Sequence, residues 1–267
     1  MPIIPQNRLR QQLAEGKTVI GTMVAEIRQP AVIQCLVNSG FDWVIIDNEH
    51  GVFSTETVAE LSRAARSIGL TPIVRVPALT YELISQSLDG GAQGVMLPRI
   101  TAPEQVRDAI AVVKYPPMGR RGSAMGRGHT EFKGGDVVQM MAESNRETFV
   151  IVQIETREAV ERIDEIVSVP GVDAALIGPN DLSIGLGVAG KMRDPVLVGA
   201  IDAMMAACAR HGVYPAIHTN DVALTAEWAR KGMRLVSISS DLGFLQKAAK
   251  EAADAIRAGG PPPPPLP

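Results

Sequence analysis

The sequence predicts an α/β fold of the (β/α)8 TIM-barrel class, in which eight parallel strands alternate with helices. Short apolar runs rich in Val and Ile, typical of strands buried on both faces, alternate with longer amphipathic segments. The alternation occurs eight times, and the 267 residues match the roughly 250 residues typical of such a barrel. A doubly wound open sheet is the alternative, because alternation alone does not show that a sheet closes.

Each expected strand is short and precedes an expected helix. The strands are predicted at residues 19–25, 43–48, 72–77, 94–98, 149–155, 174–179, 214–219 and 235–241. The helices are predicted at residues 30–38, 54–67, 81–89, 102–114, 159–167, 196–211, 222–231 and 242–257. These elements indicate one barrel domain over residues 1–258.

Residues at the element boundaries agree with these assignments. Ser54 can cap the second helix, and Asn220 or Asp221 can cap the helix that begins near residue 222. A glycine follows four of the helices, where a left-handed residue turns the chain into the next strand. These glycines are Gly40, Gly69, Gly212 and Gly232.

Two segments interrupt the alternation. Residues 115–146 form a long insertion rich in Gly and Arg between the fourth and fifth strands. Within it, residues 118–129 either close over an anionic substrate as a lid or form a solvated or subunit-contact loop. Residues 259–267 are a proline-rich tail that we expect to be extended and solvated.

Composition excludes several classes of partner. The net charge is −3 and aromatic residues make up only 4%, so nucleic acid is not an expected partner. No apolar stretch has transmembrane length and no signal peptide is recognisable, which predicts a cytoplasmic protein that does not enter membranes. Cys35 and Cys208 are expected to be reduced core residues.

Polar residues gather at the predicted carboxyl ends of the strands, where α/β barrels keep their chemistry. Glu155 and Asp181 follow the fifth and sixth strands, and Gln153 shares a strand face with Glu155. The remaining polar residues at or near strand ends are Asp47, Glu49, His50, Arg75, Asp89, His218 and Asp241. Barrel interiors are normally apolar, so packing does not explain this set.

The functional interpretation is a divalent metal held by Glu155 and Asp181, with open positions for water and an oxygen-rich substrate. Arg75 would stabilise an enolate or carboxylate oxygen, and His50 with Asp47 would serve as an acid/base pair. The structural alternative is that Glu155 or Asp181 caps a helix or forms a buried ion pair with Arg75.

Five motifs occur along the chain: GFDW at residues 40–43, DNEH at 47–50, RVP at 75–77, QIET at 153–156 and GPNDLS at 178–183. Together they resemble the HpcH/HpaI aldolase family, the metal-dependent (class II) pyruvate aldolases. This family includes 2,4-dihydroxyhept-2-ene-1,7-dioate aldolases and 2-keto-3-deoxy-sugar-acid aldolases, and it is related to macrophomate synthase. The resemblance extends over about residues 8–255. Residues 125–129 depart from the usual family sequence, which leaves the aldehyde partner open.

The resemblance implies a barrel of the phosphoenolpyruvate/pyruvate-binding type and a homo-hexamer whose subunits exchange their last helix. Glu155 and Asp181 would be the ligands of Mg²⁺, Mn²⁺ or Co²⁺. Arg75 would contact the pyruvate keto oxygen, with His50 and Asp47 as the acid/base dyad. Asp89 would lie near the site, acting across a subunit interface. The pyruvate carboxylate would bind at the backbone of Gly178, Pro179 and Asn180, with Gln153 close by.

The implied reaction is the reversible cleavage of a 4-hydroxy-2-oxo acid to pyruvate and an aldehyde through a metal-stabilised enolate. The alternatives are an oxaloacetate decarboxylase, a citrate-lyase-type acyl-CoA lyase, or a non-catalytic 2-oxo-acid-binding protein. A Schiff-base aldolase needs a lysine at the site. None of the seven lysines lies in an expected strand, which favours a metal.

Overall fold

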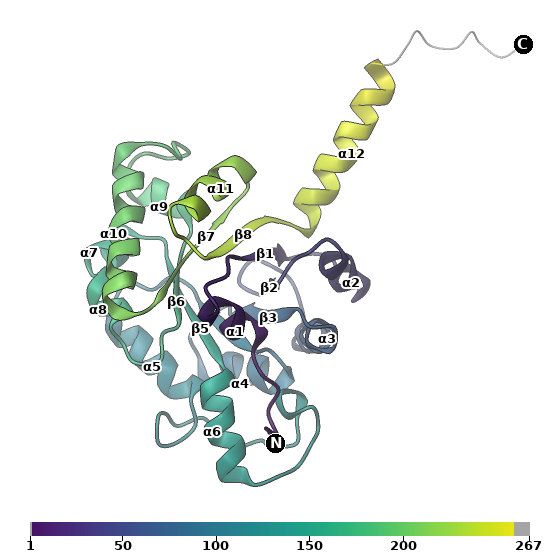
Figure 1. Ribbon diagram of the computed structural model, residues 1–267, viewed down its shortest axis with the longest axis vertical. Coiled ribbons are helices and arrows are strands. Elements are labelled where there is room, and N and C mark those ends of the chain that lie inside the picture. The colour runs from purple at the N-terminus through teal and green to yellow at the C-terminus, as the bar shows by residue number, and fades with distance from the viewer. Residues whose placement is uncertain (1, 259–267) are drawn as a thin grey trace, which may run out of the picture.

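The computed structural model describes residues 2–258, and its eight strands form a closed, fully parallel barrel in sequence order (Figure 1). The strands are β1 (Val19–Val24), β2 (Trp43–Asp47), β3 (Thr71–Arg75), β4 (Gly94–Leu97), β5 (Phe149–Ile154), β6 (Ala174–Ile177), β7 (Tyr214–Thr219) and β8 (Leu235–Ser240). Pairing of β1 with β8 closes the sheet. The predicted barrel is therefore confirmed, and the open sheet is excluded.

Within residues 2–258 the helices confirm most of the expected elements and add three α-helices and a short 3-10 helix (Gly128–Thr130). The expected ones are α2 (Ala31–Asn38), α3 (Thr55–Ser67), α4 (Tyr81–Gly90), α5 (Pro103–Val113), α10 (Pro195–His211), α11 (Val222–Arg230) and α12 (Asp241–Ala258). The helix expected at 159–167 is divided at Arg162 into α7 (Arg157–Glu161) and α8 (Ile163–Val167). The additional helices are α1 (Arg8–Ala14), α6 (Val137–Glu147) and α9 (Pro179–Gly185).

The boundary residues act as expected, with one correction. The Ser54 side chain accepts a hydrogen bond from the Thr57 amide at 3.2 Å. At the start of α11 the cap is Asp221, whose carboxylate accepts from two amides of the first turn, and not Asn220. The four glycines predicted to end helices all have positive φ.

The inside of the barrel is a separate core built from alternate strand residues. Trp43, Ile45, Ile73 and Phe149 belong to it, together with two leucines of α1 that close one end. The Trp43 ring lies directly against Gly21, where an added Cβ would overlap it. A glycine at this position therefore leaves room for the largest side chain inside the barrel.

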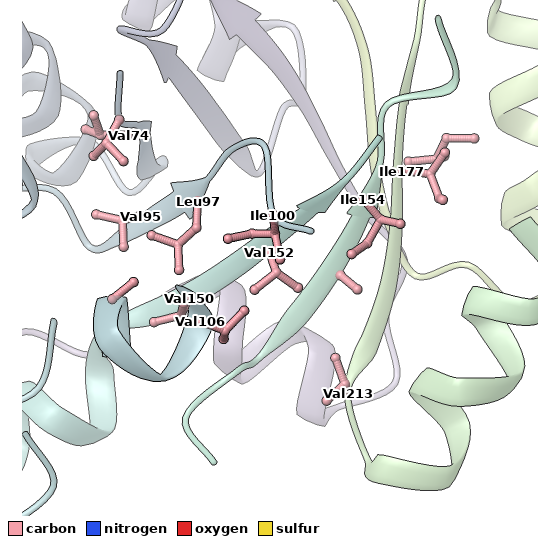
Figure 2. Close-up of a cluster of buried hydrophobic side chains, with 14 of the residues drawn as sticks. Val74, Val95, Leu97, Ile100, Val106, Val150, Val152, Ile154, Ile177 and Val213 are labelled. Atoms are coloured by element: carbon pink, nitrogen blue, oxygen red, sulfur yellow. The ribbon is translucent and has the colours of Figure 1, made fainter. Parts of the chain in front are cut away.

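The larger core lies between the outer surface of the barrel and the surrounding helices. Figure 2 shows this layer with outward-facing residues such as Val74, Val95, Val152 and Ile154, and with Val106 from α5. Because neighbouring residues of a strand point to opposite faces, each strand supplies apolar side chains to both cores. This explains the nearly continuous apolar runs that predicted the strands.

The C-terminal helix α12 projects away from the barrel (Figure 1), and Asp241 at its start is its only buried residue. The Asp241 carboxylate accepts hydrogen bonds from the amides of Glu26 at 3.0 Å and Ile27 at 2.7 Å, so it holds the chain after β1. No helix within residues 2–258 is long and apolar enough to span a membrane. The proline-rich segment 259–267 lies outside the described residues.

The insertion at residues 115–146 differs from the expected loop. It contains α6, and its preceding part packs at the amino-terminal end of the strands, where Arg66 donates to the carbonyls of Gly91, Gly128 and His129 at 3.0–3.2 Å. Gly91 lies just before β4, at the end of the barrel opposite Glu155. Of the two alternatives for residues 118–129, closure over the chain's own site is therefore wrong, and a solvated or subunit-contact loop stays a prediction.

The two cysteines also differ from each other. Cys208 is buried as expected, and burial raises the pKa of its thiol to about 12. Cys35 is exposed, so the expectation that it is a core residue is wrong.

Candidate active site

The residues at the carboxyl end of the barrel continue the inward-facing rows of the strands. Asp47 lies two residues beyond Ile45, Arg75 two beyond Ile73, and Gln153 two beyond Ile151, and all three preceding residues belong to the inner core. Strand side chains alternate with a period of two, so these polar groups point into the barrel's open end. The sequence therefore places a polar layer directly above an apolar one.

Arg75 is fixed by a bidentate ion pair with Asp47. Arg75 Nε and Nη2 each lie 2.8 Å from a different oxygen of the Asp47 carboxylate, which is 2% exposed. Burial would raise the pKa of Asp47, but the hydrogen bonds and charge of Arg75 outweigh it and the pKa is lowered. The same pair raises the pKa of Arg75 despite its burial. The guanidinium is therefore permanently charged and held in one plane.

The predicted dyad of His50 with Asp47 is not formed. The Asp47 carboxylate accepts a hydrogen bond from the backbone amide of His50 at 3.4 Å, while its oxygens are engaged by Arg75. The His50 ring is 66% exposed, and the carboxylate near it is Glu49, with 3.9 Å between Nε2 and Oε2. The prediction failed because Asp47 faces the adjacent strand, where Arg75 is its direct partner in register.

Glu155 is a buried acid held by two neighbours. Its Oε1 accepts from the backbone amide of Arg99 at 2.9 Å, and its Oε2 accepts from Gln153 Nε2 at 2.5 Å. Burial raises the pKa of Glu155, and the negative charges of Glu49 and Asp181 raise it further. The hydrogen bond from the Arg99 amide and the positive charge of Arg75 lower the pKa of Glu155, but they do not cancel this rise.

Asp181 is exposed in the first turn of α9, and its carboxylate makes no hydrogen bond or ion pair with any residue between 2 and 258. It shares a cavity of about 170 Å³ with Glu155. Two carboxylates that face one space and repel each other fit a hard divalent cation. The described residues contain no group of three or more His, Cys, Asp or Glu arranged for a metal, and Glu49 also lines this cavity.

A second cavity, of about 180 Å³, adjoins the first, because His50 and Asp181 line both. Its floor is apolar and includes Ile45, and Arg75 and His218 lie in its wall. His218 Nδ1 is 2.8 Å from a hydroxyl of β8, and burial with the nearby charge of Arg75 lowers the pKa of His218 to about 4. This wall therefore presents a neutral imidazole and one fixed cation.

The sequence matches the model of the HpcH/HpaI aldolase/citrate lyase family over residues 23–248. The chain belongs to this family. It is 30% identical over 249 residues to a hydroxypyruvate/pyruvate aldolase of Roseobacter denitrificans, covering 93% of this chain and 96% of that protein. It is also 30% identical over 257 residues to a 5-keto-4-deoxy-D-glucarate aldolase of Shigella boydii, covering 96% and 98%.

The crystal structure of an HpcH/HpaI aldolase from Desulfitobacterium hafniense superimposes with a TM-score of 0.91 at 32% identity, covering 96% of this chain and 99% of that one. The family and these relatives make the protein a carbon–carbon lyase of the pyruvate aldolase type. The resemblance inferred from the five motifs is confirmed.

Asp89 does not reach the site of its own chain. It lies near the end of α4, where one carboxylate oxygen is 2.5 Å from Arg121 Nη2 and 3.8 Å from His129 Nδ1. Helix α4 returns the chain to the amino-terminal end of the barrel before β4 begins. The resemblance implied that Asp89 acts at the site across a subunit interface, and that role stays a prediction.

Two residues of the site were assigned no role from the sequence. Glu49 Oε2 lies 3.2 Å from Arg75 Nη1, and its side chain is 7% exposed. Arg99 supplies the amide that holds Glu155, and its side chain lines the smaller cavity. The signal for Glu49 was its place within the DNEH motif. For Arg99 the signal was its position two residues after the end of β4.

Proposed function

We propose that this family member is a divalent-metal-dependent aldolase that reversibly cleaves 4-hydroxy-2-oxo acids to pyruvate and an aldehyde. The observation that carries the proposal is the shared cavity of Glu155 and Asp181, which joins a second cavity containing Arg75. Carboxylates for a cation and a fixed guanidinium are the groups needed to stabilise negative charge on a keto oxygen.

Glu155 and Asp181 would hold Mg²⁺, Mn²⁺ or Co²⁺ and leave the remaining positions to water and substrate. When bound, the cation would supply Lewis-acid stabilisation of the charge that develops on the keto oxygen. Gln153 keeps Glu155 in place through its 2.5 Å hydrogen bond. Because the pKa of Glu155 is raised, a nearby positive charge would stabilise its ionised form.

Arg75 would share the negative charge on the keto oxygen as pyruvate leaves. Its Nε and Nη2 are occupied by Asp47, and Nη1 lies 3.2 Å from Glu49, so its side chain cannot swing away. A charge that is already in position costs no reorganisation during the reaction. In this proposal Asp47 acts on Arg75 as a positioning residue.

His50 would take the proton from the 4-hydroxyl group during cleavage. Its exposed ring lines both cavities, so it lies beside the space that contains Glu155 and the space that contains Arg75. Glu49, which lies 3.9 Å from Nε2, would orient the ring in place of the predicted Asp47.

The first turn of α9 would hold the pyruvate carboxylate. The amide of Gly178 is already bonded to the carbonyl of Ile154 at 3.2 Å, and Pro179 has no amide hydrogen. The amides of Asn180 and Asp181 have no helical partner, because they lie in the first turn. The amides of Asn180 and Asp181 are therefore the donors proposed for the pyruvate carboxylate. Gly178, which has no side chain, leaves space for it beside Gln153.

A Schiff-base mechanism has no suitable lysine in the described chain. The buried lysine is Lys114, and burial lowers its pKa to about 8. Its Nζ donates to the carbonyls of Asn145 at 2.7 Å and Thr148 at 2.9 Å, just before β5 begins. It therefore lies at the end of the barrel opposite Glu155, where it joins two segments of backbone.

The homo-hexamer remains part of the proposal. Helix α12 has exposed apolar side chains, including Leu245 at 58% and Ile256 at 80%. Exchange of this helix between subunits would cover them, and Asp89 would then act at the site of a neighbouring copy. Sedimentation velocity tests the assembly directly, and a monomer at micromolar concentration would contradict it.

The function is tested by measuring pyruvate release from a panel of 4-hydroxy-2-oxo acids. Chelator-treated protein should be inactive, and Mg²⁺, Mn²⁺ or Co²⁺ should restore activity. Glu155→Gln and Asp181→Asn should prevent this recovery, whereas Asp202→Asn on the exposed side of α10 is the matched control for loss of one negative charge. Full activity in the presence of chelator, or trapping of a substrate adduct by borohydride, would refute the metal mechanism.

A further inference from the structure

Met23 lies against Arg75 in the wall of the larger cavity, the one of about 180 Å³. It continues the inward-facing row of β1, two residues beyond Gly21, and it packs on the inner core. Its Sδ is 3.9 Å from Arg75 Nη2, and its side chain is half-buried. A thioether is a weak hydrogen-bond acceptor, so this contact leaves the Arg75 donor almost unused.

The donor beside Met23 is one that Arg75 keeps for a ligand. Nη2 carries two hydrogens, and one of them donates to Asp47 at 2.8 Å together with Nε. Within residues 2–258 the hydrogen-bond partners of Nη2 are Asp47 and the sulfur of Met23. The second N–H of Nη2 is therefore open to a stronger acceptor than the thioether.

A small oxidant can reach the Met23 sulfur through the same cavity. A space that admits a 2-oxo acid also admits hydrogen peroxide, which is smaller. Met96 lines this cavity too, but it is 1% exposed and its sulfur is shielded. Met118 is 56% exposed, but it lines neither cavity. Met23 therefore combines access from the cavity with contact to Arg75.

Oxidation of Met23 by a peroxide replaces a weak acceptor with a strong one. A sulfur lone pair attacks one peroxide oxygen, the O–O bond breaks, and the other oxygen leaves as water after it takes up a proton. The sulfur loses two electrons and the peroxide gains them, which gives methionine sulfoxide. Because Sδ is 3.9 Å from Nη2, the new oxygen can accept the unused N–H of Arg75 in a charge-assisted hydrogen bond.

We propose that Met23 is an oxidation site through which a peroxide reversibly inactivates the proposed aldolase. The sulfoxide oxygen occupies the donor that Arg75 would offer to the keto oxygen, and its partial negative charge opposes the charge that develops there. This inference rests on the proposed function and adds a regulation of the same site. A methionine sulfoxide reductase with a dithiol as reductant releases the oxygen as water and restores the donor.

The test treats the Mg²⁺-loaded protein with limiting hydrogen peroxide. Catalase then removes the peroxide before substrate and activating metal are added, because peroxide destroys 2-oxo acids. Peptide mass spectrometry gives the oxidised fraction of each methionine, and pyruvate release gives kcat/KM. Met23→Leu nearly keeps the side-chain volume without the sulfur, and Met118→Leu is the matched control. Each variant is compared with its own untreated sample, and its melting temperature reports folding.

In the wild type and in Met118→Leu, activity should fall in proportion to the oxidised fraction of Met23. Full oxidation should lower kcat/KM roughly tenfold, the loss expected for one charged hydrogen bond. Met23→Leu should keep its own untreated activity, and reductase treatment should restore the activity of the wild type.

Two results would overturn the inference: Met23 stays reduced while Met118 is oxidised, or the protein with oxidised Met23 keeps full activity. Failure of the untreated wild type to release pyruvate would instead refute the proposed function. The order in which the methionines are oxidised would then still decide whether Met23 is the oxidation site.

Discussion

Replacing Asp47 with asparagine tests how Arg75 is held. The carboxylate is 2% exposed and forms both hydrogen bonds of the bidentate pair, each 2.8 Å long. Asparagine keeps the size and one acceptor oxygen, but it removes the charge that compensates the buried guanidinium. We expect Asp47→Asn to leave the fold intact and to destabilise it.

The size of the effect follows from the burial of the pair. Removing one partner of a buried ion pair costs about 3–5 kcal/mol, and the retained acceptor places this variant near the lower end. For a chain of this size that loss lowers the melting temperature by roughly 6–12 °C. Displacement of Arg75 by an ångström would reduce kcat/KM roughly 100-fold.

The pH dependence of the stability has a definite sign. The pKa of Asp47 is lowered in the folded protein, so its ionised form stabilises the fold. This contribution is complete above about pH 4, the ordinary pKa of aspartate, and is lost as the pH falls through the lower folded value. The difference in unfolding free energy between wild type and variant should therefore narrow below about pH 4.

The assay combines urea unfolding with a pH–rate profile for pyruvate release. Asp47→Asn should reduce stability and rate without moving the profile, whereas Glu49→Gln, which changes the carboxylate facing His50, should move it. Two results together would refute this reasoning: a loss of unfolding free energy below about 1 kcal/mol in Asp47→Asn, and a shift of its pH–rate profile. They would instead support Asp47 as the acid/base partner of His50.

Three further outcomes are expected. Chelator-treated Glu155→Gln should melt above chelator-treated wild type, because the buried carboxylate with a raised pKa is removed; a lower melting temperature would contradict the charge argument. Metal at about 100 times its dissociation constant should stabilise the wild type by about 2.7 kcal/mol, and Asp181→Ala should abolish this shift in differential scanning fluorimetry. Gly21→Ala should reduce the free energy of unfolding by about 1–3 kcal/mol and so lower the urea midpoint, because the new methyl group overlaps Trp43. An unchanged midpoint would show that the ring moves freely.

Most of the fold could be predicted because each strand carries its own signal. A run such as residues 149–154 is apolar on both faces, since one face fills the barrel and the other meets the helices. Helices α1, α6 and α9 were missed because they are short or lie within a Gly- and Arg-rich segment. Their formation depends on caps and contacts, such as Asp136 accepting from the Gln139 amide at the start of α6.

The sequence predicted where the candidate site lies better than it predicted which side chains contact each other there. Glu155 and Asp181 were identified because the carboxyl ends of parallel strands meet at one end of a barrel, and they do line one cavity. The partner of Asp47 was predicted wrongly because nearness in sequence favoured His50. Glu49 and Arg99 were assigned no role from the sequence, since their contacts come from neighbours on other strands.

The sequence by itself determined which residues are strands, which face of each strand enters the barrel, and at which end the acids gather. These features follow from the two-residue period of a strand and from the shared direction of parallel strands. Only the tertiary structure decided that Asp47 pairs with Arg75, that Asp89 lies at the far end, and that Arg99 reaches the cavity. Contacts between strands depend on register, barrel closure and the path of each loop, and no single segment encodes them.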